Sequence, residues 1–391
     1  MSQIYFFMIT MRFFFLVCLC IFTANCWALQ VGAERYEHYL PLLKQQRVAL
    51  VVNQTARTKH GHLLDSLLSK GVDVRVIFAP EHGFRGDHDA GAHVLSGTDI
   101  KTGVPIVSLY GKHKRPSKQQ LQNIDVIIFD IQDVGVRFYT YISTMHYMME
   151  AAAKYGKEFI VLDRPNPNIA FVDGPVLDPK FKSFVGIHPI PILHGLTVGE
   201  LAKMIVGENW LAVDKKLQLQ VIPVENYSVN TKYELPIKPS PNLPNSQAIA
   251  LYPSLCFFEA TPVSVGRGTD FPFQVYGYDP IKLGKFSFTP RSIKGVAANP
   301  KFNGRSVFGV DLRQYESDGL DLSWFINAYK RLSSDGIVFF KHAGFMDKLA
   351  GTDQLRIAIE AGKSADKIKQ SWQPSLQQYM QRRQPYLLYP R

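Results

Sequence analysis

Short apolar runs alternate with helix-like stretches through the first half of this chain. In residues 74–78, Val74, Val76 and Phe78 alternate with Arg75 and Ile77, which is typical of a β-strand. Similar runs predict strands at 48–52, 106–109, 126–129 and 159–162, with helices at 63–70, 117–123 and 141–155. Strands separated by helices need crossover connections, which favour a parallel sheet of Rossmann-like outline.

The pattern of apolar and polar positions becomes more mixed after about residue 195. Thr197 and Glu200 form a predicted capping box at the start of a helix, and 217–222 is a further predicted strand. Prolines 236, 239, 241 and 244 then indicate an irregular linker segment that leads into the second domain. A strand at 271–278 and a last helix at 375–383 follow. We therefore expect an α/β protein, with a Rossmann-like parallel-sheet domain at 29–247 and a smaller C-terminal α/β domain at 248–391 that completes a cleft.

The first 28 residues have the pattern of a secretory signal peptide. Arg12 precedes the apolar run 13–22, and Cys26, Trp27 and Ala28 form a small-x-Ala cleavage site. A membrane anchor is the alternative, but the apolar run is short and no second run of about twenty residues follows. We expect removal of residues 1–28, export to the periplasm or the medium, and no stable membrane insertion afterwards.

Charge and cysteine content narrow the classes of partner. The chain has 44 basic and 33 acidic residues, a formal net charge of +11, which favours anionic polymers such as carboxylated cell-wall glycans. The basic residues are scattered and no recognition-helix or zinc-finger pattern is present, so nucleic acid is not the expected partner. Three of the four cysteines fall within the signal peptide, which leaves Cys256 and excludes a disulfide framework.

No nucleotide cofactor is expected. The sequence has neither G-x-G-x-x-G after the first strand nor a P-loop motif, and the G-x-S-x-G elbow of serine hydrolases is also absent. The fold is therefore predicted without a bound cofactor.

Three predicted strands run into acidic residues, namely Glu81, Asp130 and Asp163. The carboxyl ends of parallel strands meet at one edge of a sheet, where ligands bind. Hydrolysis of a glycosidic bond uses a carboxylic acid together with a group that delivers or becomes the nucleophile. Such acids equally cap helices or pair with arginines. Glu81 favours the catalytic alternative because Pro80 and Gly83 confine it to a turn.

Polar and aromatic residues accompany these acids in three further segments. Sugar-binding sites combine the faces of aromatic rings with side chains that form several hydrogen bonds. The alternative interpretation is that the tyrosines are buried in the core and that the acids and arginines pair with one another. Arg267 lies between two glycines, where a guanidinium suits a carboxylate ligand. The candidates in these segments are Gln132, Asp133, Arg137, Tyr139 and Tyr141, then Asp163, Arg164 and Asn166, and Arg267.

A metal site is the second alternative. Acidic residues and histidines lie within thirteen positions, but no H-E-x-x-H or comparable spacing organises them. They are Glu81, His82, Asp87, His88, Asp89 and His93. We expect no metal here, and we expect His188 and His194 to be structural.

Four blocks resemble the signature blocks of the NamZ family, formerly a domain of unknown function. They are F-A-P-E-H-G-F-R-G at 78–86, F-D-I-Q-D-V-G-V-R-F-Y-T-Y-I-S-T-M at 129–145, L-D-R-P-N-P at 162–167 and G-R-G-T at 266–269. The resemblance extends in order from about residue 48 to the end of the chain.

The resemblance implies an exo-β-N-acetylmuramidase, which removes terminal N-acetylmuramic acid from the non-reducing ends of peptidoglycan fragments. It also implies a Rossmann-like domain, a smaller C-terminal domain and an active site in the cleft between them. It assigns Glu81 as the catalytic acid with a tyrosine beside it, for which we take Tyr139 or Tyr141, and we add Asp130 as a catalytic candidate.

The substrate implied by the resemblance carries a lactyl carboxylate, which needs a cationic partner. Its arginine candidates are Arg85, Arg137, Arg164 and Arg267, and His82 is a further substrate-binding candidate. A non-catalytic exported glycan-binding protein and a metal-dependent hydrolase remain the alternatives.

Overall fold

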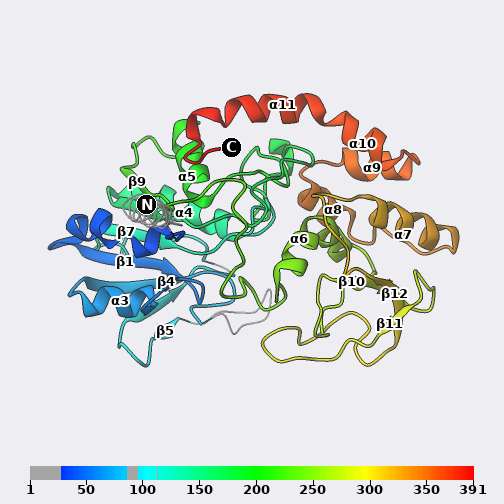
Figure 1. Cartoon of the computed structure of the whole chain (residues 1–391), viewed down its shortest axis with the longest axis horizontal. Helices are drawn as coiled ribbons and strands as arrows, with labels where there is room; N and C mark the ends of the chain where they lie inside the picture. The colour runs from blue at the N-terminus through cyan, green and yellow to red at the C-terminus, as the bar shows by residue number, and fades with distance from the viewer. Residues whose placement is uncertain (1–27, 86–95, 112) are drawn as a thin grey trace, which may run out of the picture.

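A computed structural model describes residues 28–85, 96–111 and 113–391 (Figure 1). The predicted signal peptide, apart from Ala28, lies outside the described residues. So do Asp87, His88, Asp89 and His93 of the alternative metal cluster. None of the described helices has the length and apolar character needed to cross a membrane.

A seven-stranded sheet organises the first half of the chain, in the order β5-β6-β4-β1-β7-β8-β9. All neighbours are parallel except the edge strand β5 (Gly97–Thr98). The others are β1 (Arg47–Val52), β4 (Asp73–Ala79), β6 (Pro105–Ser108), β7 (Val126–Asp130), β8 (Glu158–Leu162) and β9 (Leu219–Ile222). The strand order reverses between β1 and β7, as in Rossmann folds, so the prediction of such a sheet is confirmed.

Both faces of the sheet are buried, which explains the nearly continuous apolar strands. In β1, Val48, Leu50 and Val52 pack into one core and Ala49 and Val51 into the other. Helix α3 (Leu63–Ser69) belongs to the first core, and α4 (Tyr141–Tyr155) and α5 (Val198–Gly207) belong to the second. The capping box at the start of α5 is present as predicted.

Shorter elements complete this half. They are α2 (Tyr36–Tyr39) and the hairpin of β2 (Arg57–Thr58) and β3 (Gly61–His62). The predicted helix at 117–123 is wrong, because the segment forms turns. Leu121 and Ile124 are buried there, and so short a helix has little stability of its own to oppose the packing of these side chains.

The second half combines a small antiparallel sheet with six helices in the described residues. The sheet has the order β10-β12-β11. Its strands are β10 (Val275–Tyr278), β11 (Phe286–Phe288) and β12 (Val307–Asp311), and the helices are α6 (Ser246–Leu255), α7 (Ser323–Ser334), α8 (Ala343–Ala350), α9 (Gln354–Glu360), α10 (Ala365–Ser371) and α11 (Gln373–Arg382). The strand predicted at 271–278 begins only at Val275, because Phe273 has φ 55° and breaks the extended run.

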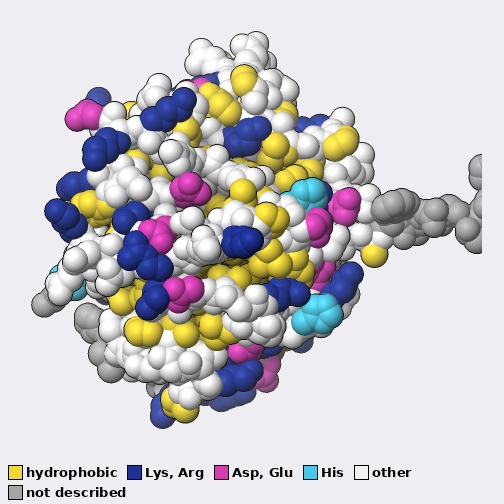
Figure 2. Space-filling view, turned by 90° about the vertical axis from the view of Figure 1, so that its left-hand side faces the viewer, with side chains coloured by type: hydrophobic (Ala, Val, Ile, Leu, Met, Phe, Trp, Pro, Cys, Tyr) yellow, Lys and Arg dark blue, Asp and Glu magenta, His cyan; other side chains and the backbone are white. Residues whose placement is uncertain are grey.

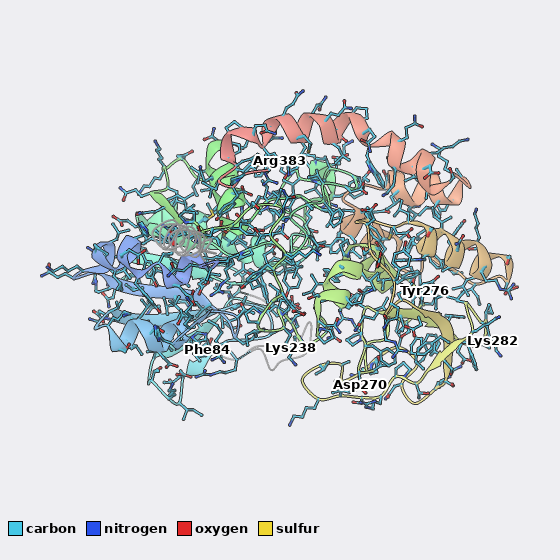
Figure 3. All side chains as sticks on the ribbon, viewed as in Figure 1. Phe84, Lys238, Asp270, Tyr276, Lys282 and Arg383 are labelled. Atoms are coloured by element: carbon cyan, nitrogen blue, oxygen red, sulfur yellow. The ribbon has the colours of Figure 1, made fainter. Side chains whose placement is uncertain are left out.

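The end of the chain returns to the first half. Helix α11 spans the top of the molecule in Figure 1 and in Figure 3, and it leads back to α5. The Tyr379 hydroxyl donates to the carbonyl of His194 at 2.6 Å, and Arg391 pairs with Glu200 at 2.8 Å. The two halves are thus packed together by the last residues of the chain.

The surface carries its positive charge in a dispersed form. On the face in Figure 2, Lys and Arg side chains are spread among acidic and apolar ones rather than gathered in one stripe. This distribution agrees with the scattered basic residues of the sequence.

Arg137 links the two halves of the chain. Its side chain is only 1% exposed, and its terminal nitrogens donate at 2.6–3.0 Å to four carbonyls, those of Pro175, Ile190, Leu349 and Ala350. Burial lowers the pKa of Arg137 to about 9, so the group stays charged at neutral pH. The structure corrects the prediction that Arg137 binds substrate, since protein carbonyls already use its terminal N–H groups.

Replacing Arg137 by Met is expected to lower the free energy of unfolding by about 3 kcal/mol, because buried carbonyls would lose their donors. Urea denaturation measures the change. Arg291→Met is the matched control, because the Arg291–Asp270 pair is exposed and its loss should cost less than about 0.5 kcal/mol. A cost below about 1 kcal/mol for Arg137→Met would contradict the assigned role.

Candidate active site

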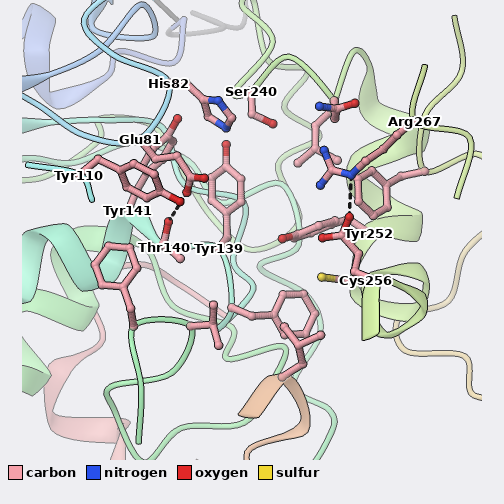
Figure 4. A pocket seen from close by; sticks show the side chains of 18 of the residues that line it. Glu81, His82, Tyr110, Tyr139, Thr140, Tyr141, Ser240, Tyr252, Cys256 and Arg267 are labelled. Carbon is pink, nitrogen blue, oxygen red and sulfur yellow. Dashed lines mark hydrogen bonds and ion pairs between the residues drawn. The ribbon is translucent and has the colours of Figure 1, made fainter. Parts of the chain in front are cut away.

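A cavity of about 290 Å³ opens at the carboxyl edge of the large sheet (Figure 4). Loops after β4, β6 and β7 form one wall, and residues of the second half form the other. The first wall includes Glu81, His82, Tyr110, Phe138, Tyr139, Thr140 and Tyr141, and the second includes Tyr252, Cys256, Glu259, Arg267 and Phe273. Ser240 and Asn242, from the proline-rich linker segment, also line it.

Glu81 lies in a tight turn on the first wall. Pro80 ends β4, and the N–H of Gly83 donates to the carbonyl of Pro80 at 3.0 Å. His82 between them has φ 69°, a conformation that non-glycine residues adopt rarely and that is often found at functional sites. The Thr140 hydroxyl donates to the Glu81 carboxylate at 3.0 Å, so the acid is fixed at the cavity surface.

Tyr110 approaches the same carboxylate. Burial raises the pKa of Tyr110, and the negative charge of Glu81, within hydrogen-bond reach, raises it further. The phenol therefore remains protonated at neutral pH. It supplies a second hydroxyl beside Glu81.

Tyr139 and Tyr141 lie next to Glu81 with their rings edge to face, 4.9 Å apart between centroids. Burial raises the pKa of both tyrosines above the usual range. The Tyr141 hydroxyl donates to the carbonyl of Pro239 at 3.3 Å, and the buried Tyr139 hydroxyl lies near Ser240. Both tyrosines are therefore neutral phenols rather than phenolates, and the Tyr141 hydroxyl has already used its proton on Pro239.

Arg267 stands on the opposite wall. Its Nε donates to Glu259 at 2.6 Å, and its guanidinium lies 5.0 Å from the centroid of Phe273. Burial alone would lower the pKa of Arg267, but the Glu259 carboxylate raises it, so the arginine keeps its charge. Figure 4 shows its terminal nitrogens pointing toward the wall that carries Glu81. The site thus combines a carboxylate and a guanidinium across one cavity.

The structure does not bring Asp130 to this cavity. Asp130 is fully buried and accepts from Nε and Nη2 of Arg164 at 2.5 and 2.9 Å, a bidentate pair. Arg164 also donates to the carbonyl of Arg57. Both residues are used internally, which corrects the predictions that Asp130 is catalytic and that Arg164 binds substrate.

Asp163 also serves the fold. It is fully buried and accepts from the hydroxyls of Thr197 and Tyr389 at 2.7 and 2.5 Å and from the N–H of Gly199 at 2.8 Å. Burial raises the pKa of Asp163 to about 6. The structure thus corrects its assignment to substrate binding, because Asp163 holds the start of α5.

Three other predicted substrate-binding residues lie off the cavity. The Gln132 amide donates to the carbonyl of Pro165 at 2.7 Å, and the Asn166 amide to that of Leu196 at 2.9 Å. Arg85 is half exposed and pairs with Asp99 at 2.5 Å. These contacts fix loops, and none of the three residues lines the cavity, so their substrate-binding roles stay predictions.

Asp133 is buried without a full set of partners. One carboxylate oxygen accepts from the N–H of Gly135 at 2.7 Å, and the other has no hydrogen bond. Burial raises the pKa of Asp133 to about 7. His194 lies 3.8 Å away, but burial lowers its pKa to about 3, so it brings no compensating charge. Asp133 does not line the cavity, so the structure gives no contact that supports its predicted role in substrate binding.

Asp133 should make stability depend on pH. Below about pH 7 the carboxyl of Asp133 is protonated in the native state, whereas in the unfolded state it ionises from about pH 4. Between these two pH values the native state binds more protons than the unfolded state. The free energy of unfolding therefore falls as the pH rises. The free energy of unfolding of Asp133→Asn, relative to that of wild type, should therefore increase by on the order of 2 kcal/mol as the pH rises from about 5 to about 8. Urea denaturation at the two pH values measures it, and parallel profiles would contradict it.

Among the described residues, no group of three or more His, Cys, Asp or Glu converges as metal ligands. His188 and His194 are both buried, and His188 contacts His146 ring nitrogen to ring nitrogen at 3.0 Å. They lie within the protein interior, away from the cavity lining.

Several lining residues were not predicted. Tyr110 follows the third predicted strand at the same sheet edge as Glu81, so strand position alone would have found it. Thr140 lies between the two predicted tyrosines. Glu259 and Tyr252 belong to an apolar helical segment, and nothing in the sequence marks them as facing a cavity.

Comparisons with known proteins cover both halves of the chain. Residues 48–247 match the family model described as exo-beta-N-acetylmuramidase NamZ, N-terminal, and residues 250–389 match its C-terminal counterpart. The chain is 37% identical over 373 residues to the peptidoglycan beta-N-acetylmuramidase NamZ of Bacillus subtilis (strain 168), which covers 90% of this chain and 89% of that protein.

Two crystal structures of DUF1343 family proteins from Bacteroides fragilis NCTC 9343 share the fold. One has a TM-score of 0.85 at 48% identity and covers 93% of this chain, and the other has 0.80 at 29% identity and covers 92%. Each likeness covers 99% of the solved chain. The similarity therefore extends through both halves and the cavity between them.

Proposed function

The chain belongs to the exo-β-N-acetylmuramidase NamZ family, and from this premise we propose that it releases terminal, non-reducing β-linked N-acetylmuramic acid from peptidoglycan fragments during cell-wall turnover, with Glu81 as the general acid. One observation carries the assignment of residues. Glu81 faces Arg267 across a cavity at the small end of ligand-pocket volumes, which suits one sugar.

Glu81 would protonate the glycosidic oxygen as its bond to the anomeric carbon breaks, and that oxygen leaves with the rest of the glycan. Water supplies the oxygen that the anomeric carbon gains and the proton that restores Glu81. A general acid must lie within hydrogen-bond reach of the glycosidic oxygen, and the cavity surface gives Glu81 this access. Thr140 and Tyr110 restrict the carboxyl to one orientation. The neutral Tyr139 hydroxyl would donate to a sugar oxygen, and the Tyr141 hydroxyl, whose proton goes to the Pro239 carbonyl, would accept from a sugar hydroxyl.

Arg267 would recognise the lactyl carboxylate of the terminal sugar. Of the four arginines considered for this role, Arg267 is the one that lines the cavity. Glu259 accepts from Nε, which leaves the terminal nitrogens available for a two-point contact with a carboxylate. Glu259 thereby acts as a positioning residue for Arg267.

The test uses purified protein with a chromogenic β-N-acetylmuramide and with the matching β-N-acetylglucosaminide. We expect turnover of the muramide and much slower turnover of the glucosaminide, which lacks the carboxylate. Binding of muramyl sugars without any turnover would instead support the non-catalytic glycan-binding alternative. Activity that chelators abolish and added metal restores would support the metal-dependent alternative.

We also propose that residues 1–28 direct export, so that the enzyme acts in the periplasm or the medium, where peptidoglycan fragments occur. The basis is the short apolar run followed by Ala28. N-terminal sequencing of protein from the producing cell should give a mature chain that begins at Leu29. A chain that retains residues 1–28 would contradict cleavage.

A further inference from the structure

The cavity has a volume suited to one sugar, so the remaining glycan would lie outside it. This inference rests on the proposed function, because it takes Glu81 as the acid. The leaving oxygen must lie at Glu81, and the terminal sugar must extend from there toward Arg267. The rest of the glycan therefore leaves the cavity on the Glu81 side, past Tyr110.

Aromatic side chains form a fixed row on that side. Tyr110 and Phe184 both line the cavity, and their ring centroids are 6.3 Å apart. Phe184 stacks on Tyr147 at 6.1 Å with an interplanar angle of 17°. The Ser143 hydroxyl donates to the Phe184 carbonyl at 2.7 Å and ties this residue to α4. The row is therefore in place before any ligand arrives.

Lys114 adds an uncompensated positive charge to this row. Its ammonium lies 4.2 Å from the centroid of Phe184, and no carboxylate pairs with it in the described part of the chain. Arg115 next to it differs, because it forms a 2.8 Å ion pair with Glu150 and lies over Tyr147. Arg115 is thus held by contacts within the protein, whereas the ammonium of Lys114 has no carboxylate partner among the described residues and can bind a ligand.

We propose that Lys114 binds a carboxylate on the part of the glycan that leaves, at a subsite beyond the cavity next to Phe184. In peptidoglycan glycans, N-acetylglucosamine and N-acetylmuramic acid alternate. The sugar after the cleaved bond is therefore uncharged, and the third sugar from the non-reducing end carries the next lactyl carboxylate. An ammonium just outside the cavity is suited to this third sugar.

The test compares kcat/KM on three synthetic substrates. The first is 4-nitrophenyl β-N-acetylmuramide, the second is a tetrasaccharide that begins with N-acetylmuramic acid, and the third is the same tetrasaccharide with the lactyl carboxyl of its third sugar converted to a methyl amide. The proteins are wild type, Lys114→Gln, Lys114→Arg and the control Lys367→Gln, which makes the same change at an exposed position of α10.

Lys114→Gln should lower kcat/KM on the charged tetrasaccharide by roughly threefold to tenfold, as expected for a partly screened ion pair. On the aryl muramide and on the amide it should match wild type. Lys114→Arg should retain the activity on the charged tetrasaccharide, and added salt should reduce the difference between Lys114→Gln and wild type. The control should match wild type throughout.

Equal effects of Lys114→Gln on all three substrates, or no effect on any, would overturn the subsite. A wild-type enzyme that treats the charged and amidated tetrasaccharides alike would overturn it too. Failure of wild type to hydrolyse the aryl muramide would overturn the proposed function together with this subsite, so the two failures are distinguishable.

Discussion

Replacing Glu81 by Gln is expected to lower kcat by roughly 10²- to 10⁴-fold on a natural disaccharide, the range typical of a lost general acid. Gln keeps the size of the side chain and can still accept from Thr140. Its amide protons are too weakly acidic to be transferred to the leaving oxygen. Binding of the substrate, measured by calorimetry, should change little, because the cavity keeps its shape.

The leaving group separates acid catalysis from other roles of Glu81. A nitrophenolate leaves without protonation, so Glu81→Gln should lose much less activity on an aryl muramide than on the disaccharide. The exposed Glu316→Gln is the matched control and should behave as wild type on both. Equal losses on both substrates would contradict the role of Glu81 as acid and indicate a different function for its carboxylate.

Replacing Arg267 by Lys is expected to lower kcat/KM on the muramide by roughly 10- to 100-fold, because contacts of a charged donor with a charged acceptor contribute about 1.5–3 kcal/mol. Lys keeps the charge but loses the planar pair of donors. The ratio of muramide to glucosaminide activity should therefore fall by a similar factor. Parallel assays of the two chromogenic substrates measure that ratio.

Arg85→Lys is the control for this experiment, because Arg85 pairs with Asp99 and does not line the cavity. It should leave the substrate ratio as in wild type. An unchanged ratio in Arg267→Lys would show that the lactyl carboxylate is bound elsewhere. Glu259→Gln offers a second comparison, since it should weaken the orientation of Arg267 without removing its charge.

The sheet was predictable because its strands are buried on both faces. Five runs from 48 to 162 contain few polar residues, and each forms a strand within about one residue of the predicted limits. The errors occur where local pattern is weak. The segment 117–123 is too short to be stable as a helix by itself, and the positive φ of Phe273 shortens β10.

A site residue could be predicted from the sequence where its place at the cavity follows from the strand that directly precedes it. Glu81, Tyr139 and Tyr141 lie at the cavity because their loops follow β4 and β7. Asp130 and Asp163 follow the same rule, yet the structure gives them internal partners. Whether a strand-end acid meets a ligand or an arginine depends on residues far away in the chain.

Asp163 shows how distant such a partner can be. Its carboxylate is held by Tyr389, 226 positions further along the chain. No local pattern connects the two residues. Glu259 differs from Asp163 in the outcome. No local pattern predicted it at the cavity, and it lies there because the second half packs against the first.

The attachment of the last residues bears on how the protein should be handled. The Tyr389 hydroxyl bridges Asp163 and the N–H of Val224, and Arg391 is the final residue. Proteolytic removal of residues 389–391 would abolish that bridge. Intact-mass measurement of a purified preparation should therefore confirm that Tyr389 is retained.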